Sequence, residues 1–208
     1  MRTVKMTKDY TIYNYCELSE DAKNRVKTEY LELDRSPEEF QFMLKENLDD
    51  KFERSPLSVR FDFSCSQGSG LNIEGSLEFS DILQIEEICN KFTEKENRAL
   101  YFYFEECYIE PYEFYENVRY FYSGKGLDRS YLASHIMYEL EENHISNINT
   151  ELVERVSNAI LDYMEDLEKS FYEWGMEYFY EISDEDMEEI SNEYGWEYLD
   201  DGETWLGR

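Results

Sequence analysis

The chain has 208 residues with 49 acidic and 20 basic side chains, a formal net charge of −29, and 17% aromatic residues. This aromatic content excludes a disordered acidic chain, because such chains lack the large apolar side chains that build a core. The sequence has no uncharged apolar window of about 18 residues, which excludes a membrane-spanning helix, and no basic stripe that would neutralise phosphates, which argues against direct binding of DNA or RNA.

The first third of the chain predicts a strand, two helices and a hairpin. Tyr10–Tyr15 alternates polar and β-prone residues, which is typical of a strand. Ser19 is placed to cap one helix, and Ser36-Pro37-Glu38-Glu39 has the cap, proline and glutamate of a second helix start. Val59–Cys65 alternates as a half-buried strand, and Leu71–Phe79 is its predicted return strand.

The loop between those strands is Gln67, Gly68, Ser69 and Gly70. It is rich in glycine, but it lacks the lysine and the following helix of a phosphate-binding loop. Glycines at this place most often supply positive φ angles in a tight turn. We therefore expect this hairpin loop to be a structural turn.

The middle of the chain predicts two aromatic strands, Arg98–Glu106 and Val118–Tyr122. Beyond them, from Glu151, apolar residues recur at three- and four-residue steps and predict a long amphipathic helix with acids on its solvated face. Ser183 is expected to cap a short helix through Ile190. The predicted fold class is α+β: an antiparallel sheet packed with several helices and a long acidic C-terminal helix, in a single domain over residues 1–208 with a possible subdivision near residues 80–150.

Acidity is concentrated at the end of the sequence. Residues 151–208 hold 19 acids and 3 bases, a net charge of −16. One interpretation is solubility, since like charges keep a protein soluble at some cost in self-repulsion. The other is mimicry of nucleic acid, because duplex DNA carries about one charge per 1.7 Å of axis and its binding proteins respond largely to that charge. On the second interpretation the expected partner-binding residues are Glu165, Asp166, Glu168, Glu173, Glu177, Glu181, Asp184 and Asp186.

No catalytic residue, metal site or cofactor is expected from the residue pattern. Paired acids such as those at Glu105, Asp184 and Asp200 are typical of divalent-metal sites, but no lysine or histidine stands beside them in the sequence. His135 lies among aromatic and aliphatic residues, which favours a partly buried side chain over a general base. Cys65 has no histidine nearby that would activate it as a nucleophile.

Three segments carry a resemblance to a family. They are Tyr13–Tyr30, the hairpin Phe63–Gly70, and the closing run Tyr178–Gly202. Together they resemble a family of uncharacterised acidic phage and prophage proteins with an "SQGDGA" hairpin, in which Ser69 stands where the family usually has aspartate. The family has an antitoxin-like label, and some acidic phage proteins of this kind are anti-CRISPR inhibitors of Cas nucleases.

The resemblance and the charge together lead to an expected function. It is a phage-encoded acidic binding protein that inhibits a host nucleic-acid-targeting defence enzyme, such as a Cas9-type nuclease, in the cytoplasm of an infected or lysogenic bacterium. The expected partner is a basic protein or its nucleoprotein complex, with no nucleic acid or membrane bound directly. Two alternatives remain open at this point: an antitoxin-like protein that neutralises a basic toxin, and a metal-dependent nuclease.

Overall fold

The computed structural model describes residues 9–63, 70–107, 109–114 and 129–205. The chain divides into two compact units, of which unit 1 combines Met1–Ser36 with Met176–Arg208 and unit 2 is Pro37–Gly175. The region near residues 80–150, where the sequence suggested a subdivision, lies inside unit 2. The fold is α+β, with a three-stranded antiparallel sheet, several packed helices and a long helix near the C-terminus, as predicted.

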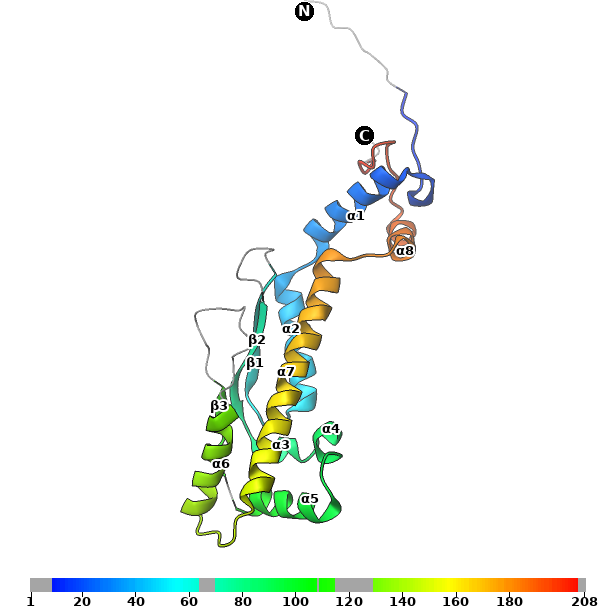
Figure 1. The fold of residues 1–208 in the computed structure, drawn as a ribbon. Coiled ribbons are helices and arrows are strands. Elements are labelled where there is room, and N and C mark those ends of the chain that lie inside the picture. The colour runs from blue at the N-terminus through cyan, green and yellow to red at the C-terminus, as the bar shows by residue number, and fades with distance from the viewer. Residues whose placement is uncertain (1–8, 64–69, 108, 115–128, 206–208) are drawn as a thin grey trace, which may run out of the picture. The chain divides into compact units, whose positions relative to one another are not determined.

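The elements appear in chain order in Figure 1. Their bounds are η1 (Tyr15–Glu17), α1 (Glu20–Asp34), α2 (Pro37–Lys51), β1 (Leu57–Asp62), β2 (Gly70–Leu77), α3 (Phe79–Ile82), α4 (Glu86–Cys89), α5 (Glu94–Tyr101), η2 (Phe102–Glu106), β3 (Tyr112–Phe114), α6 (Arg129–Glu142), α7 (Thr150–Tyr180) and α8 (Asp184–Tyr194). No helix in the described part of the chain is long and apolar enough to cross a bilayer.

The sheet of unit 2 has the order β1-β2-β3, and both pairings are antiparallel. β1 pairs with β2 from Leu57↔Gly75 to Asp62↔Gly70, which confirms the predicted hairpin, although Phe79, predicted at the end of the return strand, begins α3. Within that hairpin loop, Gly70 begins β2, while Cys65, Gln67, Gly68 and Ser69 lie outside the described residues.

Aromatic side chains fix the packing of helices on this sheet. Phe40 of α2 is fully buried, and its ring centroid lies 5.4 Å from that of Phe61, 5.8 Å from Phe63 and 5.3 Å from Trp174 of α7. Such edge-to-face pairs add about 0.5–1.5 kcal/mol each beyond the area that they bury. α2 and α7 therefore pack together against the end of β1, as Figure 1 shows.

The prediction of a strand over Arg98–Glu106 is wrong, because these residues are helical in α5 and η2. Thr93 caps this helix: its hydroxyl accepts from the Glu96 amide at 3.3 Å, and the Glu96 carboxylate accepts from the Thr93 amide at 2.8 Å. This capping box satisfies two amides at the helix start. The local cap thus overrides the aromatic pattern that favoured a strand. The second predicted strand, Val118–Tyr122, lies outside the described residues.

Unit 1 builds its own core from segments far apart in the sequence. Ser19 caps α1 by accepting from the Ala22 amide at 3.3 Å, as predicted. The α1 residues Ala22 and Val26 pack with Met187 of α8 and with Tyr198 beyond it. Tyr198 is fully buried, and its hydroxyl lies 2.7 Å from that of Ser191.

The expected strand Tyr10–Tyr15 is reduced to one bridge. Tyr13 and Tyr198 exchange two backbone hydrogen bonds of 2.9 Å, and Tyr15 already belongs to η1. The backbone that follows Tyr198 turns away from Tyr13 within a few residues, because the Gly202 amide donates to the Leu199 carbonyl at 3.0 Å. Gly202 has φ +90°, and a Cβ there would lie 2.7 Å from the Ala22 carbonyl oxygen. The chain therefore turns at residues 200–202, and this turn requires glycine at Gly202.

Candidate binding surface

The cations of α1 are held inside unit 1. The ammonium groups of Lys23 and Lys27 lie 3.6 and 2.6 Å from the Asp184 carboxylate, which also accepts from the Tyr15 hydroxyl at 3.0 Å. The hydrogen bond from Lys27, then the one from Tyr15, hold the pKa of Asp184 below its ordinary value. Asp184, predicted as a partner-binding residue, is thus already engaged in joining α8 to α1 and η1.

The two arginines of the described part of unit 1 are engaged in the same way. Arg25 lies 3.1 Å from the Asp201 carboxylate. The guanidinium of Arg35 lies over the rings of Tyr30 and Tyr178, at 5.7 and 4.7 Å from their centroids. The lysines and arginines in the described part of unit 1 thus make their contacts with groups other than the carboxylates on the outer side of α8.

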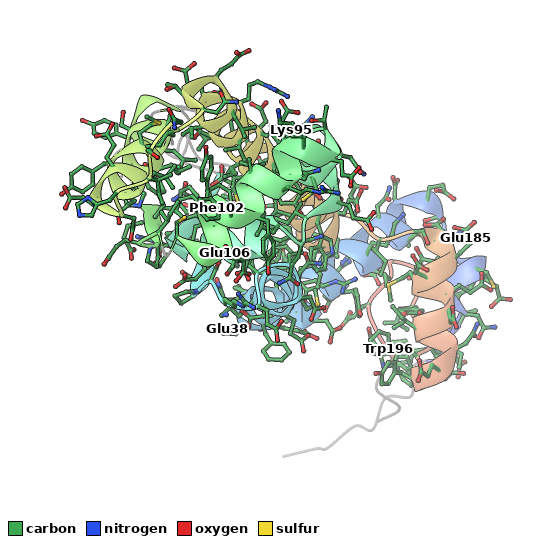
Figure 2. The ribbon with its side chains drawn as sticks, turned by 90° about the horizontal axis from the view of Figure 1, so that it is seen from below. Glu38, Lys95, Phe102, Glu106, Glu185 and Trp196 are labelled. Carbon is green, nitrogen blue, oxygen red and sulfur yellow. The ribbon has the colours of Figure 1, made fainter. Side chains whose placement is uncertain are left out.

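The outer side of α8 forms a surface, which we call the α8 surface. It begins at Glu185, and Trp196 lies just beyond the end of the helix (Figure 2). Met187 and Ser191 are buried and Ile190 packs against the same core, while Glu185 and Glu189 are exposed. Five residues of the helix line a shallow depression there: Glu185, Glu188, Glu189, Asn192 and Glu193. In the described part of the chain, none of these four glutamates forms an ion pair.

Helix stability explains only part of this surface. Ser183 caps α8 by accepting from the Asp186 amide at 3.0 Å, and acids in the first turn, such as Glu185, are favoured by the helix dipole. Glu193 stands in the last turn, where the dipole disfavours an acid. The like-charge pairs Glu185–Glu189 and Glu189–Glu193, four residues apart, each cost about 0.2–0.5 kcal/mol. Acids at the C-terminal end of α8 thus lower the stability of the helix.

A groove in unit 1 brings together three of the predicted residues, Glu177, Glu181 and Asp186. We call it the α1 groove; its volume is about 730 Å³. Its lining comes from α1, the end of α7, the connection to α8 and the start of α8: Asn24, Lys27, Thr28, Leu31, Glu177, Tyr180, Glu181, Ile182, Ser183 and Asp186. The groove therefore combines apolar side chains with carboxylates.

The remaining predicted residues lie on α7 within unit 2. Glu165, Asp166 and Glu173 are exposed, and the Glu173 carboxylate lies 3.8 Å from the Lys169 ammonium. The placement of Glu168 on the solvated face is wrong. Its side chain turns towards the sheet, and its carboxylate accepts from the Ile73 amide of β2 at 2.8 Å.

Burial raises the pKa of Glu168 to about 7, with a smaller upward contribution from Glu165, and the hydrogen bond from Ile73 opposes the rise. Between pH 4.5, the ordinary pKa of the group, and pH 7, folded protein binds more protons at this site than unfolded protein does. The free energy of unfolding should therefore fall by about 2–3 kcal/mol across this window through Glu168. Urea unfolding at pH 5 and pH 8 measures this decrease. In Glu168→Gln the free energy of unfolding should decrease by about 2–3 kcal/mol less than in the parent protein. Asp166→Asn, a change at an exposed neighbour, should show the same decrease as the parent protein. If the free energy of unfolding depends on pH equally in the two variants, Glu168 is not the cause of the decrease.

The acid pairs considered for metal chemistry are used structurally. Glu105 lies 3.1 Å from Arg54, and the Asp201 carboxylate accepts from the Glu203 amide at 3.0 Å. Within the described ranges, no group of three or more histidine, cysteine or acidic side chains is placed to hold a metal ion. His135 stacks on Phe79, and its Nε2 lies 2.8 Å from the Glu110 carbonyl oxygen.

Sequence reasoning missed the glutamates of the α8 surface, although a signal for them exists. Asp184, Met187 and Ser191 follow one another at three- and four-residue steps, so they share one side of the helix. Because Met187 is apolar, that side should face the core and Asp184 with it. The opposite side, with Glu185 and Glu189, should then have been the predicted outer surface.

Comparisons of this chain with protein-family models, with curated proteins and with solved structures found no match.

Proposed function

We propose that this protein is an acidic binding protein that docks the α8 surface in the basic nucleic-acid groove of another protein. The observation that carries the proposal is the row of glutamates on the outer side of α8, with which no cation among the described residues of unit 1 forms an ion pair. The helix holds these charges on a fixed scaffold through the Ser183 cap and the bonds of Asp184. A partner pairs charges that otherwise repel one another, so its binding offsets the cost to the helix.

The charge density of α8 is close to that of nucleic acid. Glu185 to Glu193 spans about 12 Å of helix axis at about 1.5 Å per residue. Four glutamates stand in this span, so the surface carries about one charge per 3–4 Å; each strand of duplex DNA carries about one per 3.4 Å. This agreement supports mimicry of a phosphate row over a general role in solubility.

The partner that we propose is a host nucleic-acid-targeting defence enzyme, such as a Cas9-type nuclease, and the site of action is the cytoplasm of an infected or lysogenic bacterium. The resemblance to acidic phage proteins supports this choice. The nuclease holds its guide and target in a positively charged channel. Occupation of that channel by the α8 surface blocks target loading, so inhibition should be stronger before the target is bound than after.

Removing the charge of the α8 surface should abolish most of the inhibition. In Glu185→Gln/Glu189→Gln/Glu193→Gln, three charge pairings with the nuclease are lost at about 0.7–1 kcal/mol each, which weakens inhibition about 30- to 150-fold. The measurement is DNA cleavage by a Cas9-type nuclease with the protein titrated in before and after target loading. Raising the salt concentration should weaken inhibition by the parent protein more than inhibition by this variant.

The matched control is Glu29→Gln/Glu32→Gln/Glu197→Gln, which removes the same charge from other exposed positions of unit 1. The concentration of this control variant that inhibits cleavage should lie within about threefold of that of the parent protein. Equal losses in the two triple variants would show that net charge alone acts, and the proposed surface would fail. Full cleavage at large molar excess of the parent protein would overturn the nuclease as the partner and favour a basic toxin.

A further inference from the structure

The α1 groove differs from the α8 surface in having an apolar lining. Leu31 of α1 and Ile182 of the connection between α7 and α8 are half-buried, and Tyr180 is 45% exposed. A volume of about 730 Å³ lies in the range of about 300–1,000 Å³ in which proteins bind small ligands or a few side chains. The groove is thus large enough for several side chains of a bound segment.

The charged side chains that line the groove determine which charge a bound molecule must carry. Three carboxylates line it, those of Glu177, Glu181 and Asp186. Lys27 also lines it, but its ammonium lies 2.6 Å from Asp184, which offsets its charge. An occupant must therefore bring positive charge, and it gains further by covering the apolar side chains.

We infer that the α1 groove binds a short segment of a partner protein in which arginine or lysine alternates with large apolar residues. The apolar side chains of the segment cover Leu31 and Ile182, and its cations pair with Glu177 and Glu181. The inference rests on the proposed function, because it assigns to the same basic partner a second contact that recognises sequence as well as charge. The α8 surface speeds and strengthens association, and the groove gives specificity, because burial of an apolar side chain distinguishes partners of equal charge.

The experiment measures binding of two labelled peptides to the full chain by fluorescence anisotropy. In the first peptide of eight residues, three arginines alternate with leucine and tryptophan; in the second, serine replaces the leucine and tryptophan at unchanged charge. The first peptide should bind at least tenfold more tightly. Leu31→Gln should remove this difference in affinity. Glu177→Gln/Glu181→Gln should weaken binding of the first peptide at least tenfold.

The control for the charge change is Glu32→Gln/Glu197→Gln, which should alter binding less than twofold, and thermal unfolding by circular dichroism should show that each variant is folded. Equal affinity for the two peptides, or equal losses in groove and control variants, would overturn the inference. So would a concentration-dependent dimer that Leu31→Gln dissociates, because a second copy of the chain would then occupy the groove.

Failure of this inference can be told apart from failure of the proposed function. If the nuclease is inhibited through the α8 surface while neither peptide binds in the groove, the groove inference alone is wrong. If the first peptide binds as expected while the nuclease is unaffected, the groove is supported and the nuclease as partner is wrong.

Discussion

Replacing Asp81 with alanine should lower the free energy of unfolding of unit 2 by about 3–5 kcal/mol. Asp81 belongs to α3 and is only 1% exposed. Its carboxylate accepts from the Arg54 amide at 3.1 Å and from the Ser55 hydroxyl at 2.6 Å. The Ser55 hydroxyl in turn accepts from the Glu78 amide at 3.0 Å. Hydrogen bonds to a charged group contribute about 1.5–3 kcal/mol each, and the buried donors left behind add a desolvation cost.

The expected loss is large because these bonds hold the loop from α2 to β1 onto α3. Leu57, the first residue of β1, follows this loop directly and pairs with Gly75. Chemical denaturation checks the prediction, with Asp50→Ala as the matched control. Asp50 is exposed near the end of α2, so its replacement should change stability by less than about 0.5 kcal/mol. A loss below about 1 kcal/mol for Asp81→Ala would contradict the role given to the carboxylate.

Replacing Gly175 with alanine should destabilise unit 2 by about 2 kcal/mol, although alanine is the better helix former. By helix propensity alone, replacing glycine with alanine inside a helix should stabilise the helix by about 1 kcal/mol. A Cβ at Gly175 would, however, lie 2.1 Å from the end of the Phe63 ring. That ring is held among its neighbours, with the Phe40 centroid 5.8 Å away and the Tyr172 centroid 5.5 Å away, and overpacking of such a site costs about 1–3 kcal/mol or more.

A double-mutant cycle separates the clash from other effects of the substitution. In a Phe63→Leu background the ring is gone, so Gly175→Ala should become neutral or stabilise by up to about 1 kcal/mol. Ser170→Ala, at an exposed position of the same helix, serves as the control and should be nearly neutral. Retention of the full penalty of Gly175→Ala in the Phe63→Leu background would exclude the ring as its cause.

The parts of the fold that the sequence predicted correctly are those with local causes. Ser19 and Ser183 cap helices because a hydroxyl at the right offset satisfies a free amide, whatever the rest of the chain does. The stripe of α7 runs over eight turns, so its period identified the helix without ambiguity. The β1–β2 hairpin follows from alternation alone.

The sequence failed where contacts distant along the chain decide the outcome. Glu168 belongs by pattern to an acidic helix face, yet the Ile73 amide, 95 residues away along the chain, draws its carboxylate inward. Asp184 similarly meets Lys27, 157 residues away. Glu168 was expected in the binding surface because nothing in its neighbourhood marks it as structural, whereas Asp184 shares the inward side of its helix with Met187. The α1 groove likewise exists only once α1 and α8 have packed.

The discontinuous core of unit 1 has a consequence for synthesis of the protein. Val26 packs in the same cluster as Met187, which follows it by 161 positions. At about 5–20 residues per second, a ribosome needs about 8–30 s to add this stretch. Throughout that time the apolar side of α1 lacks its native cover, while the continuous segment of unit 2 emerges from the exit tunnel. Nascent chains should therefore present α1 to chaperones until α8 has emerged and the core of unit 1 can form.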